Sequence, residues 1–242
     1  MPAGAVFAGG PIAGAQQHLY AQEETAIRHA VPKRRAEFRA GRTYARVALL
    51  ALGVAPVPIL AGNDRAPVWP PGITASITHD DTYCGVMAAT LSDFAAVGID
   101  IDSATPLDAD LVCDVCSAAE LEYRAALEEQ LRTDVPKLIF CAKESTYKAY
   151  FSLTRVVLDF PDVEIRLAPA HGAFTATVLA PAPTMPTFGR TLEGRFLAVG
   201  GHLVTWAAVP GGDAIALSKR DRAAGSAVQV TSAGVTGRRG AR

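Results

Sequence analysis

The segment from Val97 to Asp102 constrains the fold of this 242-residue chain more than any other, because apolar residues alternate in it with small or acidic ones. In a β-strand, successive side chains point to opposite faces, so the three apolar residues share one face and Gly98, Asp100 and Asp102 share the other. The pattern predicts a strand buried on one side, with two carboxylates about 6–7 Å apart on the other. Such carboxylates repel one another unless a cation lies between them. The segment therefore indicates either a metal site or an edge strand with solvated acids.

A second segment, residues 140–150 with the sequence FCAKESTYKAY, predicts a helix that carries a carboxylate between two lysines. Glu144 and Lys148 lie four residues apart and share a helix face. On their own they could form a surface ion pair, which contributes about 0.3–0.5 kcal/mol. Lys143 also flanks the acid, and two lysines beside a metal ligand suit a phosphate on which negative charge develops. Together with the two aspartates, Glu144 favours Mg²⁺ or Mn²⁺ over zinc, because the carboxylates have no His or Cys among them.

Hydrogen-bond donors end the predicted strand that precedes these acids in the chain. Ser76, Thr78 and His79 could bind a phosphate, although a single histidine is more often structural. The pair Cys113-x-x-Cys116 fits half of a zinc site or a redox pair, but no second pair of ligands lies nearby in the sequence. We therefore assign the chemistry to the strand end and not to the cysteines.

Charge is distributed unevenly along the chain, although its formal net value is only −1. Residues 28–46 contain seven basic side chains and one acidic one, whereas acids dominate residues 93–134. A basic N-terminal segment and an acidic central segment suit an enzyme that binds a polyanion through both basic side chains and a metal. Nucleic-acid binding is an alternative for the basic segment, but the segment contains no recognisable nucleic-acid-binding motif.

The order of the predicted elements indicates an α+β fold in which a helix followed by strands occurs twice, giving two similar lobes with a site in the cleft between them. The expected N-terminal lobe spans residues 1–103 and the C-terminal lobe residues 104–217, and residues 218–242 are expected to form a disordered tail. Residues 1–14, rich in Ala and Gly, are expected to be loosely ordered. Helices are predicted at 25–52, 118–132 and 136–151, and strands at 73–78, 85–91, 96–102, 163–167, 173–178, 196–200 and 203–209.

The composition, with 50% hydrophobic and 19% charged residues, is that of a soluble globular protein. No apolar run is long enough for a membrane span, and the N-terminus lacks the basic region of a signal peptide. The four cysteines are irregularly placed in a chain too large to need disulfides for stability. We therefore expect a reduced, cytoplasmic protein with neither a membrane nor a nucleic acid as its partner.

Four motifs follow one another along the chain: Trp69-Pro70-x-Gly72, Ser76-Ile77-Thr78-His79, Gly98-Ile99-Asp100-Ile101-Asp102 and Ala142-Lys143-Glu144-Ser145-x-Tyr147-Lys148-Ala149. Upstream of them lie Pro32-Lys33-Arg34-Arg35-x-Glu37-Phe38 and Arg42-x-x-x-Arg46. In this order the motifs resemble those of the 4′-phosphopantetheinyl transferases. The resemblance covers residues 31–158 and is to the monomeric, two-lobed kind that serves siderophore, polyketide and non-ribosomal peptide synthesis. The last two of the four motifs are specific in combination.

The resemblance implies transfer of the phosphopantetheine group of coenzyme A to a serine of an apo acyl or peptidyl carrier protein, with release of 3′,5′-ADP. It implies that Asp100, Asp102 and Glu144 hold Mg²⁺. Glu144 and Lys148 would act in catalysis, and either Glu144 or a water held by the metal could accept the serine proton. The residues that it implies for coenzyme A binding are Arg35, Arg42, Arg46, Ser76, Thr78, His79, Lys143 and Lys148.

Three positions depart from the family pattern. Asp102 stands where relatives commonly have Glu, and its shorter side chain suggests contact with the metal through water. Ala75 stands where Gly is usual, and Asp80 stands where Cys or Ser is usual. The added anion at Asp80 is expected to weaken phosphate binding unless it points away or pairs with an arginine. Two other functions stay open: another Mg²⁺-dependent nucleotide-diphosphate transferase or hydrolase, and a non-catalytic module that binds coenzyme A or a carrier.

Overall fold

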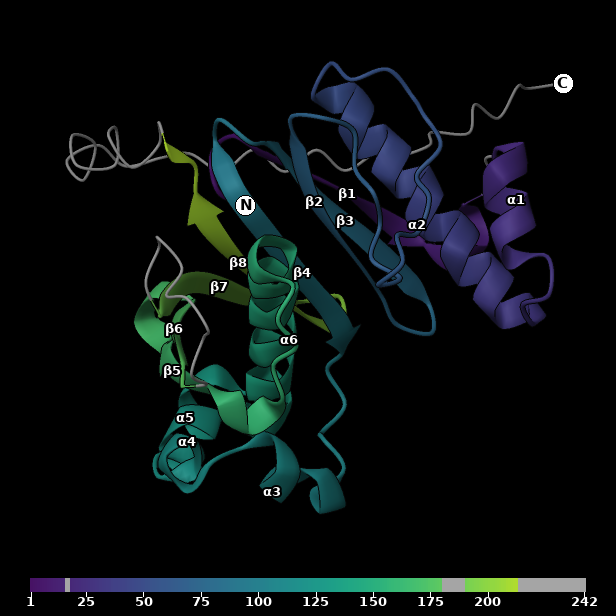
Figure 1. The fold of residues 1–242 in the computed structure, drawn as a ribbon. Helices are drawn as coiled ribbons and strands as arrows, with labels where there is room; N and C mark the ends of the chain where they lie inside the picture. Colours follow the sequence, from purple (N-terminus) through teal and green to yellow (C-terminus); the bar gives the residue numbers. More distant parts are fainter. Residues whose placement is uncertain (16–17, 180–189, 213–242) are drawn as a thin grey trace, which may run out of the picture.

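The computed structural model describes residues 1–15, 18–179 and 190–212, which form two lobes, each with an antiparallel sheet and one long helix (Figure 1). The predicted two-lobed α+β fold is confirmed. Within these described ranges no helix is both long and apolar enough to cross a membrane. The segment 218–242, for which a disordered tail was expected, lies outside the described residues.

The N-terminal lobe is a three-stranded sheet covered by helix α2 (Pro32–Ala51). The sheet has the order β1 (Ala5–Pro11), β3 (Tyr83–Thr90), β2 (Ile73–His79). The predicted helix over 25–52 is divided at Pro32, which suits a first helical position, into α2 and the short α1 (Ala21–Ile27). The core between α2 and the sheet contains Ala45, Ala48, Leu49, Ile59, Ile73, Ala75, Val86 and Ala88.

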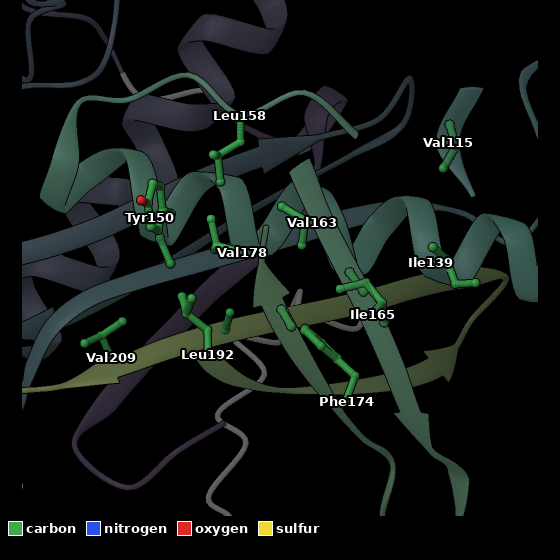
Figure 2. Close-up of a cluster of buried hydrophobic side chains, with 14 of the residues drawn as sticks. Val115, Ile139, Tyr150, Leu158, Val163, Ile165, Phe174, Val178, Leu192 and Val209 are labelled. Atoms are coloured by element: carbon green, nitrogen blue, oxygen red, sulfur yellow. The ribbon is translucent and has the colours of Figure 1, made fainter. Parts of the chain in front are cut away.

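The C-terminal lobe is a five-stranded sheet covered by helix α6 (Val135–Thr154). Its large buried core includes Tyr150 of the helix and Phe174 of the sheet (Figure 2). The strands have the order β4 (Phe94–Ser103), β8 (His202–Pro210), β7 (Thr191–Val199), β6 (Ala173–Val178), β5 (Val163–Ala168). The shorter helices of the chain are α3 (Val112–Val115), α4 (Ala118–Leu121), α5 (Arg124–Leu131), η1 (Ile12–Gly14), η2 (Ala109–Leu111), η3 (Phe160–Asp162) and η4 (Pro169–His171).

Both lobes have the same connectivity. In each, the first strand leads through helices to the remaining strands, and the last strand returns to pair antiparallel with the first: β1 with β3, and β4 with β8. The long helix then lies against that pair, α2 on β1 and β3, and α6 on β4 and β8. The lobes are therefore similar in topology as well as in content.

The expectation that residues 1–14 are loosely ordered is wrong, because they contain β1, which pairs with β3 along its whole length. Small residues make this pairing possible. Gly9 lies opposite Gly85, and a Cβ atom on Gly10 would come within 2.4 Å of the Tyr44 hydroxyl. The Ala/Gly composition that suggested disorder instead allows β1 to lie close beneath helix α2.

The expected lobe boundary after residue 103 also needs correction, because β4 pairs with β8 and so belongs to the C-terminal sheet. Since β2 and β4 lie side by side in different sheets, side chains make the connection between them. The hydroxyl of Ser76 accepts from the amide of Ile99 (3.2 Å), and that of Thr78 accepts from the amide of Ile101 (3.1 Å). On the other side of β4, an apolar cluster fills the space between the lobes; it contains Met87, Ala89, Val97, Ile99, Ile101, Val204 and Trp206.

Candidate active site

Helix α6 packs directly on the face of β4 that carries the two aspartates. A Cβ atom on Gly98 would lie only 2.0 Å from the carbonyl oxygen of Ser145, so only glycine allows this contact. Because side chains alternate along β4, Asp100 and Asp102 share the face of Gly98 and point toward the helix. The glycine of the Gly-x-Asp-x-Asp pattern therefore sets how closely the aspartates approach α6.

Asp100 is the buried centre of the site and joins three elements. Its Oδ1 accepts hydrogen bonds from the Thr78 hydroxyl of β2 (3.0 Å) and from Lys148 Nζ of α6 (2.6 Å). Its Oδ2 is buried and has no hydrogen bond from another described residue, although the Cys141 thiol lies close to this carboxylate. A buried carboxylate oxygen without a donor is costly, so this atom is well suited to contact a cation.

Glu144 lies one helical turn before Lys148 and shares the electrostatic environment of Asp100. Burial raises the pKa of Glu144; Lys148 opposes the rise, and the negative charge of Asp100 adds to it. Since the negative charges of Glu144 and Asp100 oppose one another, a cation that contacts both would relieve this repulsion. Among the described residues, however, no group of three or more potential ligands is already gathered as a metal site. The geometry fits a metal held by Asp100 and Glu144 better than by three carboxylates.

Asp102, the third predicted metal ligand, is engaged elsewhere on the same helix. Its Oδ2 forms an ion pair with Lys137 Nζ, and its Oδ1 accepts from the amide of Ser103 (2.7 Å). Lys137 is not among the site residues that the motifs predict. Its signal was helical spacing, since Lys137, Glu144 and Lys148 follow one another at intervals that keep residues on one face of α6.

Lys143, predicted to bind phosphate, lies on a different face of α6 and is almost fully buried. Its ammonium group donates to Glu120 Oε2 (2.9 Å) and to the carbonyl oxygens of Val115 (2.8 Å) and Phe160 (3.0 Å). These three contacts use all the donors of a lysine. The reason is geometric: neighbouring helix positions point about 100° apart, so Lys143 cannot face β4 together with Glu144.

Ser76 and Thr78 reach the site, but as links between the lobes. Both side chains are buried, and both accept from backbone amides of β4. Thr78 also donates to Asp100, which fixes the orientation of that carboxylate. The two hydroxyls therefore position β4 and Asp100, a role that the sequence did not predict.

His79 ends β2 and belongs to a more exposed group at the start of α2. Its Nε2 lies 3.2 Å from Arg34 Nη1 and 3.7 Å from Glu37 Oε2, and Arg34 also pairs with Glu37 at 3.2 Å. Arg34 is therefore an exposed cation next to the predicted nucleotide-binding histidine, and Lys33, also exposed, pairs with Asp81. The resemblance to the family implies Arg35, and not Arg34, as a residue that binds coenzyme A.

Two of the arginines predicted to bind the nucleotide are buried and hold the N-terminal lobe together. Arg42 stacks on the Phe38 ring at 4.0 Å and donates to the Ile59 carbonyl (2.8 Å), and burial lowers its pKa to about 10. Arg46 forms a buried ion pair with Glu23 (3.0 Å), whose side chain is fully enclosed. Their expected role in nucleotide binding stays a prediction, and their contacts are those of residues that stabilise the lobe.

Arg35, Ala75 and Asp80 have separate surroundings in the N-terminal lobe. Arg35 is partly exposed and lies 3.6 Å from Glu24 of α1. Ala75 is buried in the core beneath α2, and its methyl group fits there. Asp80 accepts from the amides of Thr82 and Tyr83 (both 2.7 Å), so its carboxylate organises a turn.

Taken together, the two-lobed α+β fold and a Thr–Asp–Lys cluster beside a second, half-buried carboxylate are features suited to an enzyme that binds an anionic group. Two family models match the chain: the 4′-phosphopantetheinyl transferase N-terminal domain over residues 22–89 and the 4′-phosphopantetheinyl transferase superfamily over residues 96–204. The break between the two matches falls near the start of β4. The chain belongs to the 4′-phosphopantetheinyl transferase superfamily and is an enzyme of that class.

Curated relatives agree with this assignment. The 4′-phosphopantetheinyl transferase Svp of Streptomyces mobaraensis is 40% identical over 196 residues, which cover 79% of this chain and 78% of the relative. The 4′-phosphopantetheinyl transferase PptT of Mycobacterium tuberculosis is 35% identical over 191 residues, covering 76% and 83%. Enterobactin synthase component D of Salmonella typhi is 31% identical over 177 residues, covering 65% and 70%.

Proposed function

We propose that this enzyme transfers 4′-phosphopantetheine from coenzyme A to a serine of an apo carrier protein, with Mg²⁺ as its metal and 3′,5′-ADP as the leaving product. The observation that carries the proposal is the buried Asp100, held by Thr78 and Lys148 and left with one unpartnered oxygen beside Glu144. Phosphoryl transfer depends mainly on positioning and on neutralising charge. This cluster supplies a fixed carboxylate, a cation and a second carboxylate for that purpose.

In this proposal Asp100 and Glu144 would hold the metal, which would supply positive charge for a bound pyrophosphate, and Mn²⁺ could replace Mg²⁺. Asp102 contributes from a greater distance, because Lys137 engages one of its oxygens. Lys148 is partly exposed and donates to both Asp100 and the Ile99 carbonyl, so its ammonium is fixed at the seam next to the expected phosphates. It would neutralise charge that develops on the leaving group.

The chemical step forms a bond between the serine oxygen and the phosphorus of phosphopantetheine and breaks the phosphorus–oxygen bond to 3′,5′-ADP. The electron pair of the broken bond leaves with the nucleotide. We propose that Glu144 accepts the serine proton, because it is a carboxylate on the same helix face as Lys148 and close to Asp100. The nucleotide would lie toward the exposed cations at the start of α2, with Arg34 and His79 in place of the buried Arg42 and Arg46.

We propose further that the acceptor is a carrier of siderophore, polyketide or non-ribosomal peptide synthesis, and that the enzyme acts as a cytoplasmic monomer. Nucleic-acid binding has little support, because acidic partners already face the basic run of α2: Glu23, Glu24, Glu37 and Asp81.

Mass spectrometry provides the direct test. Apo carrier proteins from several pathways are incubated with the enzyme, coenzyme A and Mg²⁺, and at least one should gain the mass of phosphopantetheine. The same mixtures with EDTA, or with a nucleotide diphosphate that lacks the pantetheine arm, should give no gain. If coenzyme A binds but no carrier is modified, the chain is a binding module. Turnover of the nucleotide without pantetheine would instead indicate a different transferase or hydrolase.

A further inference from the structure

The tip of the hairpin between β2 and β3 is tied to the opposite lobe through Asp80. One carboxylate oxygen of Asp80 accepts from the amides of Thr82 and Tyr83, both at 2.7 Å, and so builds the turn. The other oxygen lies 3.0 Å from Nε2 of His202, the first residue of β8. Burial alone would raise the pKa of Asp80, but the two amide hydrogen bonds, the Thr82 hydroxyl and His202 outweigh it and lower the value.

Each ring nitrogen of His202 lies next to an acceptor. Its Nδ1 lies 3.1 Å from the Gly200 carbonyl oxygen, and its Nε2 lies 3.0 Å from the Asp80 carboxylate. The ring also packs against Tyr83, with 5.5 Å between the ring centroids. Three contacts thus fix the orientation of His202 toward the hairpin.

The Asp80–His202 pair is better shielded from water than the Lys33–Asp81 ion pair at the same hairpin tip. The side chains of Asp80 and His202 are 9% and 23% exposed, whereas those of Asp81 and Lys33 are 82% and 66% exposed. Exposed pairs contribute little, because water screens them and their side chains lose entropy on pairing. Of these two ion pairs, the link from Asp80 to the other lobe is therefore the one better suited to restrict movement of the tip.

The position of the pair connects it to the site. Asp80 directly follows His79, and His202 lies opposite Ser103 in the β4–β8 ladder, one residue beyond Asp102. A change at this contact would shift the histidine end of β2 relative to the carboxylate strand. Asp80 is also one of the departures from the family pattern, so this explains the residue that the sequence marked as unfavourable.

We propose that Asp80 and His202 form a latch between the lobes that positions His79 relative to β4 for binding of the substrate nucleotide. The proposal rests on the proposed function for the identity of that ligand, but the latch itself exists independently of turnover. Asp80 and His202 are positioning residues, since neither touches the reacting groups.

Kinetics of full-length variants test the positioning role. His202→Phe keeps a ring against Tyr83 but removes both nitrogens, and Asp80→Asn keeps an oxygen for the turn but removes the charge. Each should raise KM for coenzyme A about three- to tenfold while kcat stays within about twofold, and the double variant should be no worse than either single one. His171→Phe, on an exposed turn of the same lobe, is the matched control and should leave both constants unchanged.

Hydrogen exchange separates failure of the latch from failure of the proposed function. In the intact chain without substrate, amides of residues 79–83 should exchange faster in His202→Phe than in the wild type, and those of α6 should not change. Unaltered exchange and unaltered KM would overturn the latch. Faster exchange in an enzyme that modifies no carrier would support the latch and reject the assigned reaction. A fall in kcat as large as the rise in KM, with effects of the two substitutions that add in the double variant, would also overturn the latch.

Discussion

Helices α2 and α6 carry polar stripes with the same spacing but use them in opposite ways. Each helix has 20 residues and lies on the paired first and last strands of its sheet. The stripe of α2 is Arg35, Arg39, Arg42 and Arg46, and that of α6 is Lys137, Cys141, Glu144 and Lys148. The arginine stripe faces α1 and the loop around Ile59, whereas the α6 stripe faces the aspartates of β4.

The partners of these side chains explain the difference. Arg46 meets a fully enclosed Glu23, whose oxygens also accept from the amides of Tyr20 and Ile59, so the charge of this buried carboxylate is matched within the lobe. Asp100 keeps an unpartnered oxygen next to Glu144, so charge in the α6 stripe is left incompletely matched. A buried ion pair whose polar atoms all have partners stabilises a fold. A buried charged group with a polar atom that lacks a partner is available to bind a ligand.

Replacement of Asp100 should have the largest effect on the reaction. Asp100→Ala removes the carboxylate that Thr78 and Lys148 hold, and transfer should fall on the order of a thousandfold. The chain should still fold, and coenzyme A should still bind in part through the cations of α2. Carrier modification is followed by mass spectrometry and coenzyme A binding by calorimetry. A variant with wild-type rates would show that the α6 stripe is not the catalytic one.

The arginine stripe predicts a loss of stability instead of a loss of chemistry. Arg46→Ala leaves the enclosed Glu23 without its cation and should lower the free energy of unfolding by about 3–5 kcal/mol. Urea denaturation measures this loss. The double variant Glu23→Gln with Arg46→Met should recover most of it, because no buried charge is left unpaired. If kcat falls in the refolded single variant while stability is unchanged, Arg46 belongs to the site after all.

Two lysines of α6 provide a matched test of the metal arrangement. Lys137→Met frees Asp102 from its ion pair and adds negative charge near Asp100, so Mn²⁺ affinity measured by electron paramagnetic resonance should rise about fivefold. Lys143→Met, on the other face of the helix, should leave Mn²⁺ affinity unchanged and destabilise the fold, because Glu120 loses its partner. Similar affinities in the wild type and Lys137→Met would mean that Asp102 is remote from the metal.

Much of the fold could be predicted because it follows from local patterns. Alternation located β2, β3 and β4, and the apolar face of 136–151 located α6 within a few residues. The Gly-x-Asp-x-Asp pattern also placed both aspartates on the face that meets α6. β1 was missed because its residues are small for packing reasons that depend on Tyr44 and β3, which lie far away in the sequence.

The site was predicted less completely, because burial and pairing are tertiary properties. Helical spacing places Lys148, four residues after Glu144, on the face of that acid and Lys143 on another face, but it does not show that Glu120 will bind Lys143 or that Asp100 will bind Lys148. Likewise, nothing near Arg46 in the sequence shows that Glu23 will enclose it. Helical spacing could have identified Lys137 and the arginine stripe, whereas the partners of each required the structure.

Thiol labelling gives the smallest expected effect and tests whether α6 stays closed on β4. The cysteines of α6 and its neighbours differ in exposure: Cys113 is exposed, whereas Cys116 and Cys141 are buried. Burial raises the pKa of Cys116 to about 12 and that of Cys141 well above its usual range, so both are almost entirely protonated at pH 8. Iodoacetamide should therefore label Cys113 first, with peptide mapping as the readout. Fast labelling of Cys141 in the native protein would mean that the α6 stripe becomes exposed to solvent. The two helices would then differ in mobility as well as in how completely their charges are paired.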